Sequence, residues 1–445
     1  MRSNRSSSGQ ALRGKALDRI EITRAARFAG EVTPPPDKSI SHRAVMFSSL
    51  ARGKGVVRNF LRAQDTESTM HAFRALGIEI DDQGHTLIIQ GKGLHGLTEP
   101  ADIIDCGNSG TTIRLLSGVL SANPFFSVVT GDSSLRSRPM ARIIKPLSLM
   151  GARIAGRDQN RYAPFAISGG SLKAISYDMP MASAQVKSAI LLAGLYAGGS
   201  TLITEPSKSR DHTERMLPAF GADLKTDGLS VSIHSGKELY AQEIDVPGDF
   251  SSAAFFMVAA LLIPGAEVML KNVGINPTRT GLIDVLRNMG AHIVIDNVRS
   301  VSGEPVADIF CKGQTGLKAA TVTAEMVPSL IDEFPILCIA AARAEGTTII
   351  RGAEELRLKE SDRIKAMATE LSKMGVALEE FPDGLSITGT ETLRPAEVDS
   401  HGDHRIAMSM AVAGLIAEGT TAISNASAVA ISFPDFFTSI RRLTA

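Results

Sequence analysis

The sequence contains little of what disulfide-stabilised, membrane-spanning or base-stacking proteins require. Among 445 residues it has three cysteines, Cys106, Cys311 and Cys338, and no CxxC pair, so a disulfide framework is excluded and we expect a reduced, cytoplasmic setting. Tryptophan is absent and aromatic residues make up only 5%, which argues against a platform for stacking nucleic-acid bases. The longest apolar run, residues 253–263, is shorter than the ~20 residues that span a bilayer, so we expect a soluble protein without membrane contact.

The chain also lacks an excess of charge of either sign. Its 47 lysines and arginines balance 47 aspartates and glutamates, so it has no general attraction for nucleic acid or anionic membrane, although a local basic cleft is compatible with this balance. With 44% hydrophobic and 21% charged residues the composition is that of a globular protein, and the length predicts two or three domains. Residues 1–15 are rich in serine and arginine without an apolar segment, which predicts a disordered tail, with a targeting presequence as the alternative.

One pattern recurs six times along the chain. Each copy has a loop of small residues, an apolar helix, a turn centred on glycine or asparagine, and a strand of β-branched residues. The copies span residues 39–59, 108–130, 183–205, 251–272, 331–351 and 404–425. Most are followed by a second, amphipathic helix that ends at a glycine, as helices with a left-handed C-cap do. The pattern predicts α/β modules that alternate strands with helices.

The modules divide naturally into three plus three. A module of about 70 residues buries little surface alone, so neighbouring modules should pack together. Proline-rich residues 33–36 and residues 246–248 precede equivalent points of the repeat, and proline fixes φ where glycine frees it. We interpret both segments as hinges, with ordinary loops as the alternative. The predicted lobes are residues 34–246 and residues 16–33 together with 247–445.

In four copies a loop of small polar residues leads directly into the helix. A helix N-terminus offers unpaired N–H groups and the positive end of the helix dipole, and a lysine or arginine in the first turn would complete a phosphate or carboxylate site. N-capping alone explains any one such motif, but recurrence at equivalent positions favours anion binding. The four motifs are Asp37-Lys38-Ser39-Ile40-Ser41-His42-Arg43, Gly107-Asn108-Ser109-Gly110-Thr111-Thr112, Ala182-Ser183-Ala184-Gln185-Val186-Lys187 and Gly402-Asp403-His404-Arg405.

Further charged residues lie near these junctions. Asp332 is flanked by apolar residues that should bury it and raise its pKa, and Glu360 lies between cations that could hold it ready for proton transfer. A structural ion-pair network is the alternative. His401 and His404 have no further ligands at suitable spacing, so no metal is predicted. Any one arginine could be solvated surface charge, but together they predict a cationic cleft for an acidic small molecule; they are Arg114, Arg138, Arg210, Arg357, Arg363 and Arg405.

These motifs, read together from Gly30 to the C-terminus, resemble the 5-enolpyruvylshikimate-3-phosphate synthase family. Further matching motifs are Arg138-Pro139-Met140, Arg210-Asp211-His212-Thr213-Glu214 and Lys359-Glu360-Ser361-Asp362-Arg363. The segments Ala184-Gln185-Val186-Lys187 and Arg210-Asp211-His212 resemble the family's second class more than its first. The resemblance implies an α/β fold of two lobes, each of three βαβαββ repeats. It also implies transfer of the enolpyruvyl group of phosphoenolpyruvate to the 5-hydroxyl of shikimate 3-phosphate, with release of phosphate, in aromatic amino-acid biosynthesis. Neither a metal nor an organic cofactor is expected.

The resemblance implies a role for each matching residue. Asp332 would be the base at the 5-hydroxyl, Glu360 the proton shuttle to the methylene carbon, and Lys38 would share the proton traffic. Phosphoenolpyruvate would be held by Lys38, Arg138, Arg363 and Arg405, with backbone help at Asn108, Gly110 and Thr111 and a contact from Gln185. His404 would also bind substrate. The phosphate of shikimate 3-phosphate would contact Ser39, Arg43, Ser183, Ala184, Gln185 and Arg210, and its ring hydroxyls Asp332 and Lys359. Such an acid–base pair inside a cationic clamp is what protonation of an enol ether during hydroxyl attack requires.

Two positions depart from the family pattern, and two alternatives stay open. Pro36 stands where the family usually has glycine, and Ile431 where it has a late lysine. In the family that the chain resembles, a small residue at the position of Gly110 leaves room for glyphosate, so the resemblance implies that glyphosate competes with phosphoenolpyruvate. The sister transferase acting on UDP-N-acetylglucosamine typically carries a reactive cysteine in its first lobe, whereas residues 136–142 contain none. A non-catalytic anion-binding protein is the other alternative, and we expect a monomer.

Overall fold

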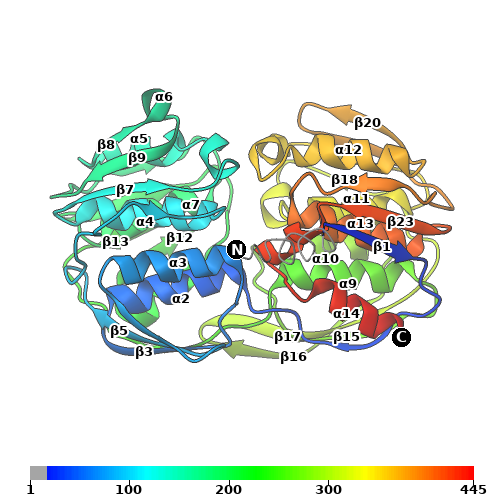
Figure 1. Ribbon diagram of the computed structural model, residues 1–445, viewed down its shortest axis with the longest axis horizontal. Coiled ribbons are helices and arrows are strands. Elements are labelled where there is room, and N and C mark those ends of the chain that lie inside the picture. Colours follow the sequence, from blue (N-terminus) through cyan, green and yellow to red (C-terminus); the bar gives the residue numbers. More distant parts are fainter. Residues whose placement is uncertain (1–17) are drawn as a thin grey trace, which may run out of the picture.

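A computed structural model describes residues 18–445, which form two lobes side by side (Figure 1). The tail predicted for residues 1–15 lies outside the described residues. Among the described residues, no helix is both long and apolar enough to cross a membrane.

The first lobe contains α2 (Lys38–Leu50), β3 (Arg52–Arg58), α3 (Gln64–Ala75), β4 (Glu79–Asp82), β5 (Leu87–Lys92), β6 (Ile104–Asp105), α4 (Gly110–Ala122), β7 (Phe126–Thr130), η1 (Leu135–Ser137), α5 (Ala141–Leu149), β8 (Arg153–Gly156), the short turn α6 (Arg157–Asn160), β9 (Tyr162–Ser168), β10 (Ser176–Asp178), α7 (Ala184–Gly194), β11 (Ser200–Thr204), α8 (His212–Met216), η2 (Leu217–Phe220), β12 (Asp223–Asp227), β13 (Ser230–His234) and β14 (Glu243–Asp245), where η marks a 3₁₀-helix. The second lobe contains β1 (Arg19–Thr23), β2 (Ala29–Val32), α9 (Phe250–Leu262), β15 (Glu267–Gly274), α10 (Gly281–Asn288), β16 (Ile293–Val301), β17 (Glu304–Lys312), β18 (Thr321–Val322), η3 (Val327–Ser329), α11 (Phe334–Ala342), β19 (Thr347–Ile350), η4 (Glu354–Leu358), α12 (Arg363–Lys373), β20 (Ala377–Phe381), β21 (Gly384–Thr388), β22 (Glu397–Asp399), α13 (His404–Ile416), β23 (Thr420–Ser424), η5 (Ala426–Ile431) and α14 (Phe436–Thr444).

The strand order of the sheets reflects the sequence repeat. Among residues 18–445 there are six sheets, and five share one strand pattern, with a parallel first pair and two antiparallel strands after it. Their orders are β14-β3-β5-β4, β6-β7-β9-β8, β10-β11-β13-β12, β2-β15-β17-β16 and β18-β19-β21-β20. The sixth, β1-β23-β22, keeps the parallel β22–β23 pair and adds β1 antiparallel to β23. The predicted α/β fold of repeated units in two lobes is therefore confirmed.

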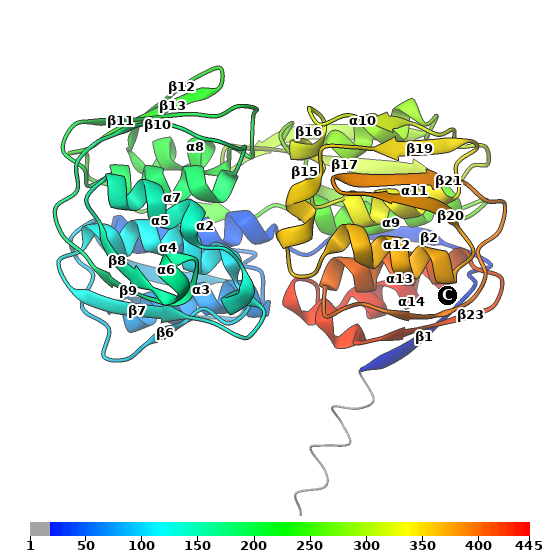
Figure 2. The same cartoon turned by 90° about the horizontal axis from the view of Figure 1, so that it is seen from above.

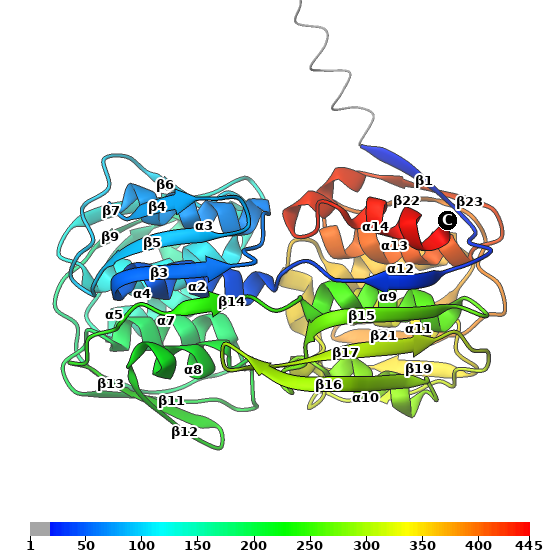
Figure 3. The same ribbon diagram turned by 90° about the horizontal axis from the view of Figure 1, so that it is seen from below.

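Strands from distant parts of the chain complete three of these sheets. β14 joins the sheet of β3, β2 joins that of β15, and β1 joins that of β23. The dark blue strand beside β15 in Figure 3 is part of the second lobe, although the chain continues from it into α2 of the first. Residues 19–32 thus lie with the second-lobe sheets.

The chain crosses between the lobes at two adjacent points. The Asp37 amide donates to the Pro247 carbonyl and the Asp249 amide to the Pro35 carbonyl, both over 2.7 Å. Pro36, which has no amide hydrogen to donate, forms a β-bridge with Gly248 at the same place. The two crossing segments therefore support each other directly in front of α2 and α9, the first helices of the two lobes.

A third connection is the hairpin of β16 and β17, whose turn reaches from the second lobe to the first (Figures 2 and 3). The Asp245 amide of the first lobe donates to Ser302 Oγ over 2.9 Å, and His212 Nδ1 lies 2.7 Å from Glu304 Oε1. The lobes are thus linked on the side where α8 lies as well as at the crossing segments.

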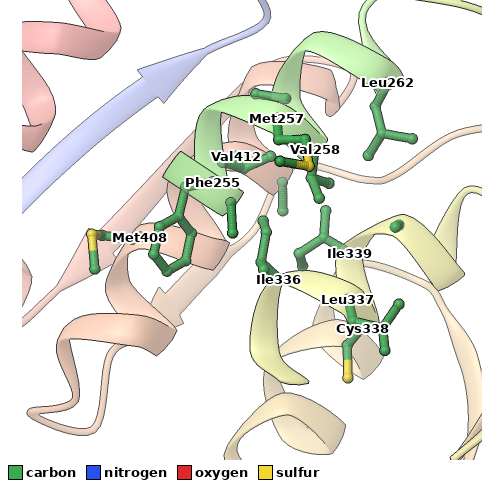
Figure 4. Close-up of a cluster of buried hydrophobic side chains, with 14 of the residues drawn as sticks. Phe255, Met257, Val258, Leu262, Ile336, Leu337, Cys338, Ile339, Met408 and Val412 are labelled. Carbon is green, nitrogen blue, oxygen red and sulfur yellow. The ribbon is translucent and has the colours of Figure 1, made fainter. Parts of the chain in front are cut away.

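Each lobe has its own apolar core around central helices. In the second lobe all 13 residues of α9 are buried, as expected of a helix that is apolar on every face. Figure 4 shows Phe255 and Val258 of α9 against Ile336 of α11 and Val412 of α13. The three helices bring their N-termini to one side of the lobe, and this arrangement positions the site described next.

The second helices of the modules end largely as predicted. Gly77 after α3 has a φ of 84° and Gly221 after η2 has a φ of 100°, in the left-handed region that glycine favours. In the third module the segment that ends at Gly221 is not one α-helix but α8 followed by the 3₁₀-helix η2. Pro218 lies at the start of η2, where it cannot donate the hydrogen bond that a continued α-helix would need.

Candidate active site

A cavity of about 400 Å³ lies between the lobes and is lined by residues from both. The lining brings together most of the predicted site residues. These are Lys38, Ser39, Arg43, Gly110, Thr111, Arg138, Ser183, Ala184, Gln185, Arg210, Asp332, Lys359, Glu360, Arg363 and Arg405. Asn108 and His404 do not belong to the lining and lie behind it. Arg357, predicted to face the cleft, does not line the cavity either, because its guanidinium donates to Asp362 and Glu380 instead.

Helix N-termini supply much of the positive character of this cavity. The helices predicted after the four small-residue loops begin at Lys38, Gly110, Ala184 and His404, so all four junctions are confirmed as helix starts. Each is capped by the preceding side chain, for example Asp37, which accepts from the Ile40 amide over 2.8 Å. The remaining N–H groups and the helix dipoles favour anions in the cavity.

On the first-lobe side, Arg43 is held in a fixed orientation. Its Nε donates to Thr213 Oγ1 and its Nη2 to Ser188 Oγ, both over 2.8 Å, and its Nη1 donates to the Ser39 carbonyl over 3.1 Å. Burial lowers the pKa of Arg43 to about 10, with Glu214 opposing the change, so the guanidinium stays charged at neutral pH. A rigid cation at the N-terminus of α2 is suited to binding a phosphate.

Arg138 is oriented by Asn108, which explains why Asn108 lies behind the lining. Arg138 Nη2 donates to Asn108 Oδ1 over 2.5 Å, and Asn108 Nδ2 donates to Asp132 over 2.7 Å. Gly110 lies beside this guanidinium: a Cβ atom there would be 2.9 Å from Arg114 Nη1 and 3.3 Å from Arg138 Nη1. The absence of a side chain at Gly110 thus lets two arginines approach the first turn of α4.

The expectation that burial raises the pKa of Asp332 is wrong. Burial alone would raise it, but Arg210, Arg405 and Arg363 together outweigh burial and hold the pKa well below its usual value. Arg210 Nη2 donates to Asp332 Oδ2 across the cleft, and Arg363 Nη1 donates to Oδ1 over 3.2 Å. Asp332 is therefore ionised and able to accept a proton.

Glu360 is held ionised by a similar arrangement. Arg363 Nη2 donates to Glu360 Oε2 over 2.7 Å, and Arg138 Nη1 of the other lobe lies 3.6 Å from Oε1. Burial alone would raise the pKa of Glu360. The charges of Arg363 and Arg138 outweigh burial and hold the pKa well below its usual value. Arg363 is in turn fixed by Asp403, whose Oδ2 accepts from its Nε over 2.8 Å.

Lys38 and His404 lie close to this carboxylate. Lys38 Nζ donates to Asp65 Oδ2 over 3.0 Å, a partner that the sequence motif does not contain. Neither ring nitrogen of His404 has a hydrogen-bond partner among the described residues, and burial, with the charge of Lys38, lowers its pKa to about 3. His404 is therefore a neutral imidazole within reach of the charges of Lys38 and Glu360.

Several lining residues were not predicted from the sequence. Arg142, Glu355, Asp249 and Arg279 line the cavity, and none belongs to a loop–helix motif. Arg279 of the second lobe donates to Asp37 Oδ2 and to Asp249 Oδ1, both over 3.1 Å, and so links the caps of α2 and α9. Arg142 could have been anticipated, because it lies four residues after Arg138, at the start of α5.

Neither a metal centre nor a reactive cysteine appears in the part of the chain that the structure describes. Residues 18–445 contain no group of three His, Cys, Asp or Glu side chains that could hold a metal ion. Cys106 is buried, burial raises its pKa, and it does not line the cavity. The cavity lining offers guanidinium groups, helix N-termini and several carboxylates, among them Asp332 and Glu360, a set suited to proton transfer on bound anionic substrates.

The chain is similar along nearly its whole length to one family of known proteins. The family described as EPSP synthase (3-phosphoshikimate 1-carboxyvinyltransferase) matches residues 22–440. The 3-phosphoshikimate 1-carboxyvinyltransferase of Geobacter sp. (strain M21) is 54% identical over 420 residues, covering 94% of this chain and 98% of the relative. That of Thermodesulfovibrio yellowstonii is 55% identical over 429 residues, covering 96% and 100%. The 2.37 Å structure of EPSP synthase from Acinetobacter baumannii is similar with a TM-score of 0.85 at 50% identity, covering 96% and 98%.

Proposed function

The chain belongs to the EPSP synthase (3-phosphoshikimate 1-carboxyvinyltransferase) family, and from this premise we propose how the residues of its cavity divide the reaction. The enzyme transfers the enolpyruvyl group of phosphoenolpyruvate to shikimate 3-phosphate in the shikimate pathway. The observation that carries the residue assignment is the convergence of arginines from both lobes on Asp332 and Glu360 within one cavity.

Finer features of this enzyme are also proposed. The Gln185 side chain on α7 and Arg210, both in the cavity, favour the second class of the family. Two separate apolar cores support the proposed lobes of residues 34–246 and of 16–33 with 247–445, of which the structure describes residues 18–445. We propose that the enzyme acts as a monomer. The three cysteines are free and buried, which fits a reducing cytoplasm.

Shikimate 3-phosphate is assigned to the side of the cavity formed by α2, α7 and the Arg210 loop. Arg43 and Arg210 would bind its phosphate together with Ser39 and the α7 N-terminus at Ser183, Ala184 and Gln185. Asp332 and Lys359 of the second lobe would contact the ring hydroxyls, which places the attacking 5-hydroxyl beside Asp332. This substrate therefore touches both lobes and favours their closure.

Phosphoenolpyruvate is assigned to the side formed by α4, α12 and α13. Lys38, Arg138, Arg363 and Arg405 would bind its carboxylate and phosphate, with the α4 N-terminus at Gly110 and Thr111. Ile431, which replaces the late lysine of the family, does not line the cavity, so the four cations just named would carry this role. Asn108 and His404 act from behind, through Arg138 and Glu360.

The proposed reaction uses the two carboxylates in sequence. The 5-hydroxyl loses its proton to Asp332, with Lys38 sharing the proton traffic, and its oxygen bonds to the central carbon of phosphoenolpyruvate as Glu360 protonates the methylene carbon. The resulting tetrahedral intermediate then loses phosphate, which carries away the proton held by Asp332 and Lys38, and Glu360 takes a proton back from the methyl group as the double bond re-forms. Anionic substrate on Arg138 and Arg363 would weaken their hold on Glu360, and the pKa of Glu360 would rise toward the value that a proton donor needs.

The assay that tests this function measures phosphate release from phosphoenolpyruvate. We expect release that depends on shikimate 3-phosphate. Release with UDP-N-acetylglucosamine in its place would support the sister transferase, and no release with either would support a non-catalytic binding protein.

Gly110→Ala should weaken the binding of both phosphoenolpyruvate and glyphosate, because we expect the two molecules to compete for one site. The new methyl group would lie 2.9 Å from Arg114 Nη1 and 3.3 Å from Arg138 Nη1, so these guanidinium groups must move. We expect the KM for phosphoenolpyruvate to rise about tenfold and the inhibition constant of glyphosate to rise at least as much. Gly170→Ala is the matched control, because a Cβ there meets nothing within 4 Å. Unchanged values for Gly110→Ala would contradict the assignment.

A further inference from the structure

Arg142 and Glu355 form a charged contact between the lobes that has no part in the proposed chemistry. Two other charged contacts between the lobes, Arg210 with Asp332 and Arg138 with Glu360, involve residues that already have a proposed role toward the substrates. Arg142, at the start of α5 in the first lobe, donates through Nη1 to Glu355 Oε1 of η4 in the second lobe over 3.0 Å. Both side chains line the cavity, and both are 18% exposed.

The oxygen that joins the lobes also holds a residue of the proposed site. Glu355 Oε1 accepts from Lys359 Nζ over 2.9 Å, four residues along the chain. Lys359 and Arg142 lower the pKa of Glu355 to about 2 against the raising effect of burial, which is the largest single influence, so Glu355 is ionised at neutral pH. One carboxylate oxygen thus connects Arg142 of one lobe to Lys359 of the other.

The presence of the Glu355 carboxylate in a cavity for two anionic substrates requires an explanation. By charge alone it repels phosphate and carboxylate groups, and the cavity already contains two other acids with assigned roles. Its geometry supplies the reason, because Arg142 can reach Glu355 only while the two lobes are together. The contact therefore joins the lobes in this arrangement, and the same Glu355 oxygen holds Lys359 there.

We propose that Glu355 is a positioning residue which couples lobe closure, through Arg142, to the placement of Lys359 against shikimate 3-phosphate. The proposal rests on the role of Lys359 proposed above. When the lobes meet, Arg142 fixes the carboxylate, and the fixed carboxylate directs the Lys359 ammonium group to the ring hydroxyls. Glu355 itself touches neither substrate.

The test is a double-mutant cycle of Glu355→Gln and Arg142→Gln. Glutamine keeps the shape of Glu355 but cannot form the charged contact with Arg142 and Lys359. We expect Glu355→Gln to raise the KM for shikimate 3-phosphate about tenfold and the KM for phosphoenolpyruvate less than about threefold. The double variant should be no worse than the worse single variant. A lower KM for both substrates, as relief of repulsion would give, or additive effects of the two changes, would overturn the proposal.

Matched variants separate this proposal from its premise. Arg62→Gln and Asp82→Asn remove a salt bridge of 2.9 Å inside the first lobe, away from the cavity lining, and should change neither KM. Lys359→Met tests the premise: an unchanged KM for shikimate 3-phosphate would refute the role of Lys359. If Lys359→Met raises that KM and Glu355→Gln does not, the coupling through Glu355 is refuted while the role of Lys359 stands. Arg142→Gln, which alters only the other lobe, tests the contact without changing η4.

Discussion

Glu360→Gln should bind both substrates and lose turnover by about 10²–10⁴-fold, the range typical of general acid–base catalysis. The amide keeps the shape of the side chain and an oxygen that can accept from Arg363, whose Nη2 lies 2.7 Å from Glu360 Oε2. It cannot deliver a proton to the methylene carbon. The measurements are kcat by phosphate release and the dissociation constant of each substrate by calorimetry. We expect kcat to fall while the dissociation constants change less than about threefold.

A control and a pH profile sharpen this result. Glu379→Gln alters an exposed acid on β20 of the same lobe and should leave kcat unchanged. Since Glu360 has to be protonated before it can act as an acid, the wild-type kcat should depend on an ionisation that disappears in Glu360→Gln. Turnover of Glu360→Gln within about threefold of the wild type would show that another group protonates the substrate.

The fold could be predicted where its determinants are local. The six helix starts and their turns follow from apolar runs, small-residue loops and glycines that lie within a few tens of residues of each other. The partners of β1 could not be predicted, because Ile22 pairs with Thr421 at the far end of the chain and no pattern in residues 19–23 specifies that partner. The order of the strands is set by the packing of whole modules.

The site, like the fold, could be predicted where its features are local in the sequence. Loop–helix motifs are local, and the sequence places Lys38, Gly110 and Ala184 correctly at helix starts. Charge interactions are not local, which is why the pKa of Asp332 was predicted in the wrong direction. Its apolar neighbours in the chain indicate burial, whereas the arginine that donates to it across the cleft, Arg210, is 122 residues away.

Of the proposed substitutions, Lys187→Met should lower the free energy of unfolding most. Lys187 is fully buried in α7, and its Nζ lies 2.6 Å from both Glu205 Oε2 and Glu214 Oε1. Methionine fills a similar volume but leaves two buried carboxylates without a cation. Breaking a buried ion pair on one side costs ~3–5 kcal/mol, so we expect a decrease of that size in the free energy of unfolding of the first lobe, measured in urea.

The site should respond to the same change. Glu205 accepts from the Ser209 amide and hydroxyl, and so fixes the loop that carries Arg210 to the cavity. We therefore expect Lys187→Met also to raise the KM for shikimate 3-phosphate. Lys225→Met, on the exposed strand β12, is the control and should lower stability by less than about 0.5 kcal/mol.

A compensated variant separates lost charge balance from lost packing. Lys187→Met combined with Glu205→Gln and Glu214→Gln has no buried ionised group left at this place, and replacing a whole buried charge cluster by neutral residues is often tolerated. We expect it to recover part of the free energy that Lys187→Met loses. If the triple variant is less stable than Lys187→Met, or if Lys187→Met loses less than about 1 kcal/mol, the cluster does not stabilise the first lobe through its charge balance.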